Sequence, residues 1–163
     1  MFLSGIKHIT VITRGGILAL VFLAVIFSPS VITAGDKKRT DGIGITIGNV
    51  AGVSFKHFLN KKKNAIDAAF SVTDGKLHLI GSYLWHDYEA LPPVEEGELP
   101  LVYGAVLGIY RGEAAAGGVV GVAYIFKEDY PFDIFLHLMP VVVFSSSASM
   151  NFQGALGARY YFR

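Results

Sequence analysis

At 163 residues the chain has the size of one domain, and 52% of it is apolar while only 17% is charged, a low charge density for a water-soluble surface. The absence of cysteine excludes a disulfide framework, a thiolate metal site and a lipidated cysteine anchor. A formal net charge of +1 gives no basic excess of the kind that binds nucleic acid, so no nucleic-acid partner is expected.

The first 34 residues have the pattern of a cleavable secretory signal peptide. Lys7 and Arg14 precede the apolar run GILALVFLAVIF, and Ile32 and Ala34 stand at positions −3 and −1 of a matching cleavage site. The alternative is an uncleaved membrane helix, but the apolar run is shorter than the roughly 20 residues that a helix needs to cross a bilayer. We therefore expect an exported chain that begins after Ala34.

Residues 35–41 are expected to form a polar spacer, and residues 42–163 a single β-barrel domain. In this domain apolar residues recur with period two between turn signals, which predicts an all-β fold. Eight strands are expected, at residues 42–48, 52–59, 65–72, 76–86, 101–111, 118–127, 132–144 and 150–162. This even number in a hairpin rhythm predicts an eight-stranded antiparallel up-and-down outer-membrane β-barrel.

The hairpin around the sequence TDGK has a predictable register. Its Asp-Gly pair favours a two-residue type I′ turn, which places Thr73 opposite Lys76. Counting outward from the turn, Ser71 faces His78. One face of this hairpin is then apolar throughout, and the other mixes polar and small residues.

The last strand shows the same division between two faces. Phe152, Leu156, Ala158, Tyr160 and Phe162 fall on one face, and Gln153, Ala155, Gly157, Arg159 and Tyr161 fall on the other. In a soluble barrel the apolar face points inward and the other face must be rich in charge. Here that other face carries mainly small residues along the strands, so we expect it to fill a narrow lumen while the apolar face meets lipid.

The inward face carries a few polar side chains that are expected to form a network in the lumen. Its members are Lys56, Asp67, Asp133, His137 and Arg159. Arginine stays charged, so it must be paired when buried, and the antiparallel return of the last strand brings Arg159 level with Asp133. Lys56 is expected to pair with Asp67, because they stand opposite each other in their hairpin. The alternative is that Arg159 reaches the periplasmic rim and serves as an interfacial anchor.

Aromatic residues gather at the ends of the fourth, sixth and eighth expected strands. They are Tyr83, Trp85, Tyr124, Phe126, Tyr160 and Phe162. Strands that alternate in direction bring these ends to one rim, which predicts half of an aromatic girdle at a membrane interface. The alternative is that aromatic residues are simply common in strands.

Two features favour a soluble periplasmic barrel instead. The first two expected strands are shorter than the roughly 9 to 11 residues of a membrane-spanning strand. The longest connection, residues 87–100, falls at the same end as both termini, where turns of outer-membrane barrels are normally short.

Several segments resemble a group of small bacterial outer-membrane barrels, similar in architecture to the OmpA and OmpX transmembrane domains. The segments are GIGITIGNVAGVSFKHFLNKKKNAIDAAFSV, LHLIGSYLWHDY, PFDIFLHLMP and the terminal GALGARYYF. The last of them is similar to the end-of-chain signal that the barrel assembly machinery reads, except that Arg163 follows the final aromatic residue. The resemblance implies outer-membrane location and barrel architecture, with that machinery as a partner during biogenesis and outer-membrane lipid as the surroundings.

Residue patterns for catalysis, cofactors or metals are weak. His57, His78, His86 and His137 lie on different expected strands without ligand spacing, so no metal site and no cofactor is expected.

Some small outer-membrane barrels modify lipid A, and the sequence places His137 near the serines of residues 145–147. In the deacylase type a serine follows the histidine by two residues, whereas Met139 stands there in this chain. Asp87 is expected at the other end of the barrel, so no catalytic triad is predicted. The lysines of residues 61–63 are expected to form a solvated turn, with lipid phosphate as the alternative ligand.

The function expected from the sequence is that of a structural, envelope-stabilising or surface-interaction protein rather than a pore. Eight strands enclose a lumen just wide enough for side chains, which disfavours general diffusion. Two alternatives are a barrel that holds a small apolar ligand and an enzyme that modifies lipid A. A surface partner is not identified by any motif.

Overall fold

The computed structural model describes residues 40–73, 75–127 and 129–162. The strands are β1 (Asp41–Gly48), β2 (Gly52–Leu59), β3 (Asn64–Thr73), β4 (Lys76–Asp87), β5 (Gly97–Glu98), β6 (Leu101–Tyr110), β7 (Glu113–Phe126), β8 (Phe132–Phe144) and β9 (Ser149–Tyr161). One 3₁₀ turn, η1 (Asn60–Lys62), joins β2 to β3. The predicted signal peptide and most of the predicted spacer lie outside the described residues.

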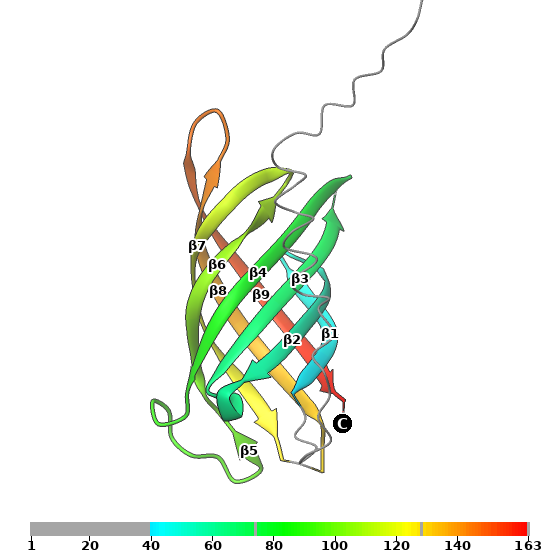
Figure 1. Ribbon diagram of the computed structural model, residues 1–163, viewed down its shortest axis with the longest axis vertical. Coiled ribbons are helices and arrows are strands. Elements are labelled where there is room, and N and C mark those ends of the chain that lie inside the picture. The colour runs from blue at the N-terminus through cyan, green and yellow to red at the C-terminus, as the bar shows by residue number, and fades with distance from the viewer. Residues whose placement is uncertain (1–39, 74, 128, 163) are drawn as a thin grey trace, which may run out of the picture. The chain divides into compact units, whose positions relative to one another are not determined.

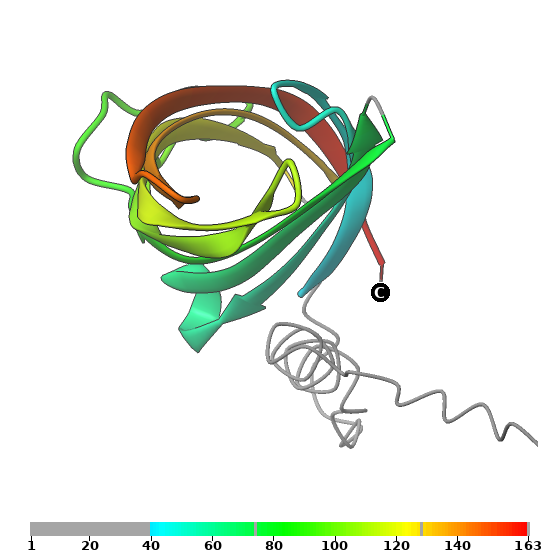
Figure 2. The ribbon, with the colours of Figure 1, turned by 90° about the horizontal axis from the view of Figure 1, so that it is seen from above.

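The eight long strands form a closed antiparallel barrel, which confirms the predicted fold class. Each pairs with the strand before and after it in the chain, and β1 closes the ring by pairing with β9. Figure 2 looks down this ring, and Figure 1 shows the strands running obliquely around it. Among the residues that the structure describes, no helix is long and apolar enough to cross a membrane.

The strand register agrees with the register expected from the turn chemistry. Thr73 pairs with Lys76 and Ser71 with His78, as an Asp-Gly turn demands, although Asp74 itself lies outside the described residues. The neighbouring hairpin sets Lys56 opposite Asp67, and the last hairpin sets Asp133 opposite Arg159. Because side chains alternate along a strand, this register decides which of them share the interior.

Side chains alternate between a buried inner face and an exposed outer face. On β8 the residues from Phe132 to Phe144 alternate exposed and buried with hardly a break, and β9 does the same. The exposed residues are large and apolar, for example Leu107, which is 58% exposed on β6. Four charged residues are instead buried: Lys56, Asp67, Asp133 and Arg159. The barrel is therefore apolar outside, and its interior holds these four charges among many buried apolar side chains.

Two elements differ from the sequence prediction. Strand β7 begins at Glu113, five residues before the expected start at Gly118. The sequence did not predict this earlier start because the stretch AAAGG has no alternation of large and small residues. Pairing with β6 and β8 holds this stretch in the sheet. The two-residue β5 was not expected. It precedes β6 in the chain and pairs with the end of β7, and the hydrogen bond from the Ala123 N–H to the Pro100 carbonyl connects this pairing to that of β6.

The two ends of the barrel differ in their connections. The terminal rim, where β1 begins and β9 ends, carries η1 and the long connection between β4 and β6, as expected from the sequence (Figure 1). The far rim carries the connections after β1, β3, β6 and β8. Strands β1 and β2 have eight residues each, so both are short, as predicted, although β1 begins one residue earlier than expected. Asn49 lengthens this part of the wall, since its N–H donates to the Gly154 carbonyl at 3.0 Å and its Oδ1 accepts from the Gly154 N–H at 2.8 Å.

Candidate functional site: a buried charge cluster inside an apolar outer face

Four charged side chains from four strands meet inside the barrel, and we call them the charge cluster. Lys56 lies on β2, Asp67 on β3, Asp133 on β8 and Arg159 on β9. Their relative exposures are between 0% and 6%. Two cations and two anions balance, so the cluster has no formal net charge. The register places all four on inward positions at a similar height, which is why residues up to 103 positions apart in sequence can meet.

Arg159 is the centre of the cluster. Its guanidinium forms ion pairs with Asp67 and, at 3.4 Å, with Asp133. Its Nε donates a hydrogen bond to the Ser54 hydroxyl at 2.8 Å. The Phe135 ring lies against the same guanidinium, 3.7 Å from its central carbon. The planar fork of arginine suits this arrangement because it can pair, donate and stack at the same time. Arg159 therefore lies in the lumen and not at the rim.

Lys56 has a different partner from the one expected. Its Nζ lies 3.5 Å from Asp133, whereas the Asp67 that faces it in register is engaged by Arg159. Neither of these ion pairs joins neighbouring strands, because long side chains reach across a narrow lumen as easily as along its wall. The Lys56 ammonium also lies 4.3 Å from the centre of the Phe58 ring, a cation–π distance. The cluster thus ties together strands that are three positions apart in the ring, β2 to β8 and β3 to β9.

Asp133 Oδ2 is the shared acceptor of the cluster. The Tyr161 hydroxyl donates to it at 2.6 Å, and both cations lie within ion-pair distance. Burial of charge costs several kcal/mol per ion unless such partners compensate it, about the scale on which whole proteins are stable. The cavity that borders Arg159 and His137 has a volume of about 20 Å³, room for about one water molecule. This cavity is too small for an apolar ligand.

His137 belongs to the same wall but not to the ion pairs. Its ring lies 4.7 Å from that of Phe135, and its Nε2 has no hydrogen-bond partner in the described part of the chain. His86 packs between Phe58 and Tyr88, and His57 lies against Asp41 at 2.7 Å on the outside. Within residues 40–162, apart from the two that are not described, no group of three or more His, Asp or Glu side chains could hold a metal ion.

All six predicted girdle residues lie at the terminal rim on the outer face. The rings of Tyr83 and Trp85 are 4.9 Å apart, those of Tyr124 and Phe126 4.8 Å, and those of Tyr160 and Phe162 5.3 Å. Two more aromatic residues, which were not predicted, complete these contacts: Tyr103 stacks on Trp85 and Phe132 meets Tyr160. Phe132 begins β8 and Tyr103 is the third residue of β6, so the rule that strands alternate in direction could have identified both.

The residues considered for a catalytic triad are not brought together. Asp87 lies at the terminal rim, where its carboxylate accepts from the backbone N–H groups of residues 89 and 90. The Ser145 hydroxyl donates to the Ser147 carbonyl at 2.7 Å in the turn at the far rim. Acid and serines therefore lie at opposite ends of the barrel.

The lysines of residues 61–63 lie in and beside η1 at the terminal rim. Lys61 and Lys62 have positive φ angles of 54° and 68°, a conformation that costs energy for residues other than glycine. The Tyr88 hydroxyl donates to the Lys62 carbonyl at 3.1 Å and so connects the long connection to this turn. Burial raises the pKa of the Tyr88 phenol, and the Glu98 carboxylate raises it further, so this donor stays protonated.

Comparison of the chain with protein-family models, with curated proteins and with solved structures gives no match. The fold itself shows that the chain forms a small eight-stranded antiparallel barrel with many exposed apolar residues.

Proposed function

We propose that this chain is a small outer-membrane barrel with a structural, envelope-stabilising or surface-interaction role. The proposal rests on one observation: the outward face of the described strands carries charged side chains only at strand ends. Asp41 and Asp87 are these exceptions, and both lie at the terminal rim. A soluble barrel needs a wet, charged outer face, whereas lipid favours the apolar one found here.

The height of the apolar face fits a bilayer along the longest strands. On β8 the outward residues between Phe132 and Phe144 are apolar, and the strand has 13 residues. With a rise of about 3.4 Å per residue and a tilt of about 40°, such a strand covers about 30 Å along the barrel axis, close to the hydrocarbon thickness of a membrane. The aromatic rings at the terminal rim then stand where a membrane interface would lie.

The interior supports a structural role rather than transport. The charge cluster and its aromatic neighbours fill the lumen at the height of Arg159, and the adjacent cavity holds about one water molecule. A general diffusion path needs a continuous aqueous channel, which wider barrels provide. The resemblance of the strand segments to the OmpA and OmpX transmembrane domains favours the same role. It also favours assembly by the outer-membrane barrel machinery and location in the outer membrane.

The proposal is tested by fractionating the envelope of cells that produce the chain and comparing gel mobility before and after boiling. We expect recovery with the outer membrane and a heat-dependent shift in mobility, because a closed barrel resists detergent until it is heated. Recovery in the soluble periplasmic fraction without detergent would contradict the proposal. The Arg159→Leu variant is a useful comparison, since a barrel weakened from inside should lose the shift at a lower temperature.

A further inference from the structure

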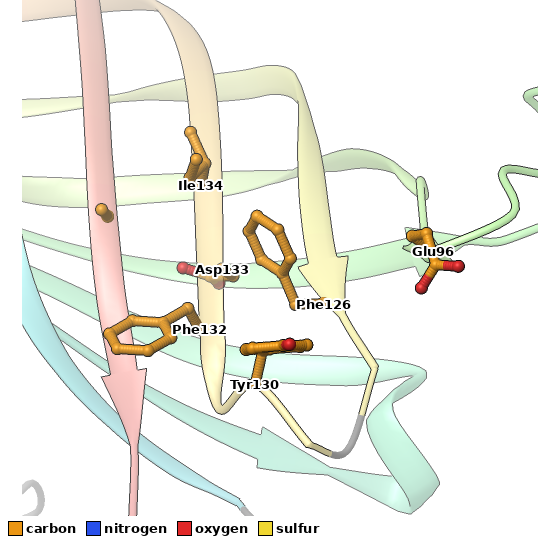
Figure 3. Close-up of a pocket in the computed structure, with 7 residues that line it drawn as sticks. Glu96, Phe126, Tyr130, Phe132, Asp133 and Ile134 are labelled. Atoms are coloured by element: carbon orange, nitrogen blue, oxygen red, sulfur yellow. The ribbon is translucent and has the colours of Figure 1, made fainter.

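A groove of about 440 Å³ lies on the outer face at the terminal rim (Figure 3). It is lined by Glu96, Phe126, Tyr130, Phe132, Ile134 and Ala158, together with part of Asp133, whose carboxylate belongs to the charge cluster. Figure 3 shows the three aromatic rings gathered together, with Glu96 set apart from them on the long connection. The groove therefore has an apolar part and a charged edge.

The apolar part follows the outward face of β8 from the rim toward the middle of the barrel. Phe132 is 45% exposed and Ile134 46%, so both are open to whatever surrounds the barrel. Ala158 on β9 pairs with Ile134, and its small side chain leaves the depression between the rings. A depression of this kind, directed along the strands, fits a hydrocarbon chain.

The charged edge carries both signs. Glu96 Oε2 lies 3.3 Å from Lys127 Nζ, and both side chains are more than half exposed. An exposed pair like this is weak, so either partner can exchange its contact for a ligand at little cost. The other charged residues within two positions of Glu96 or Lys127 in the described sequence are the acidic Glu95, Glu98 and Asp129. A purely anionic ligand is disfavoured here, whereas a ligand with an ammonium next to a phosphate matches Glu96 and Lys127.

We propose that this groove binds one zwitterionic aminophospholipid of the surrounding leaflet, with its ammonium at Glu96, its phosphate at Lys127 and one acyl chain along Phe132 and Ile134. The inference rests on the proposed membrane location, because the ligand is a lipid of the leaflet that would surround the terminal rim. A primary ammonium donates hydrogen bonds to a carboxylate, which a quaternary choline headgroup does not. The site therefore discriminates ethanolamine from choline as well as from anionic glycerol headgroups.

The test is native mass spectrometry of the delipidated barrel, titrated separately with phosphatidylethanolamine, phosphatidylcholine and phosphatidylglycerol that carry identical acyl chains. We expect one phosphatidylethanolamine to bind about three- to fivefold more tightly than either other lipid, the range that one exposed ion pair supports. Glu96→Gln should remove this preference, while the adjacent Glu95→Gln, which does not line the groove, should keep it.

A second pair of variants tests the shape of the groove. Ala158→Phe should fill the depression and abolish the bound lipid, whereas Ala105→Phe, an outward alanine on β6 away from the groove, should not. Equal affinity for the three lipids, or unchanged binding to Ala158→Phe, would overturn the proposal. A lipid-free dimer that Ala158→Phe dissociates would assign the groove to a second copy and also overturn it. A heat-shifted barrel in the outer membrane that shows no lipid preference would refute this inference alone, whereas a soluble protein would refute the membrane location as well.

Discussion

The two faces of the same strands have opposite chemistry. On β9, Arg159 points inward and is 1% exposed, while its neighbour Tyr160 points outward and is 43% exposed. On β8 the same contrast separates Asp133, which is fully buried, from Ile134, which is 46% exposed. A water-soluble barrel also buries apolar residues, but it carries its charges on the outer face, whereas here the outer face is apolar and four charges are buried. A shift of the strand pairing by one residue would move every side chain of the strand to the other face, so the register decides which side chains reach the charge cluster.

The largest expected effect comes from breaking the inner face at Arg159. Arg159→Leu leaves Asp67 and Asp133 without their central partner, and we expect it to lower the free energy of unfolding by about 3 to 5 kcal/mol. Urea unfolding of the barrel refolded in lipid vesicles measures the change. Gln in place of the exposed Lys76 is the control, since that residue lies at a strand end outside the cluster.

The ion pairs also predict which second substitution should restore most of the stability that Arg159→Leu loses. Asp133 keeps Lys56 and Tyr161 as partners when Arg159 is lost, but Asp67 loses the one ion pair that the described residues give it. Asp67→Asn combined with Arg159→Leu should therefore recover more stability than Asp133→Asn combined with it. Strictly additive losses in both double-mutant cycles would show that these side chains do not interact.

The next largest effect tests the outer face. Leu107→Arg places a charge on an outward position that is 58% exposed and lies in the middle of β6. In lipid this should cost about 2 to 4 kcal/mol, because the charge loses its water, whereas on a water-exposed surface the cost is about zero. Unfolding in vesicles is the measurement, with Leu107→Phe as the control. Normal assembly and unchanged stability of the Arg variant would reverse the assignment of the two faces.

A smaller effect is expected at Gly157, where the inner face is crowded beside Arg159. A Cβ at Gly157 would lie 2.3 Å from the Phe135 ring, which packs on Arg159. Gly157→Ala should therefore displace this ring and cost about 1 to 3 kcal/mol in unfolding experiments. A Cβ at the outward Gly118 meets its nearest atom at 3.7 Å, so Gly118→Ala is the matched control. If both variants were equally stable, the inner face would have room for a methyl group at Gly157 and the expected crowding would be wrong.

Much of the fold follows from the sequence because side-chain alternation and turn chemistry are local signals. The Asp-Gly turn determined the register of the hairpin formed by β3 and β4, and side-chain alternation with the antiparallel return of β9 placed Asp133 beside Arg159. The start of β7 had no such signal, since Ala and Gly look alike on both faces. The partner of Lys56 could not be predicted either, because contacts across the lumen depend on side-chain reach and not on strand neighbours.

The central claim is that the apolar outer face meets lipid with the terminal rim at the interface, and Trp85 tests it most directly. It is the single tryptophan of the chain, it is 40% exposed, and it lies among the girdle rings. Its fluorescence should be measured in vesicles whose lipids carry bromine at different depths. We predict strong quenching by bromine near the headgroups, weaker quenching by bromine near the acyl chain ends, and little quenching by water-soluble iodide. Strong iodide quenching together with no effect of brominated lipid would contradict the account.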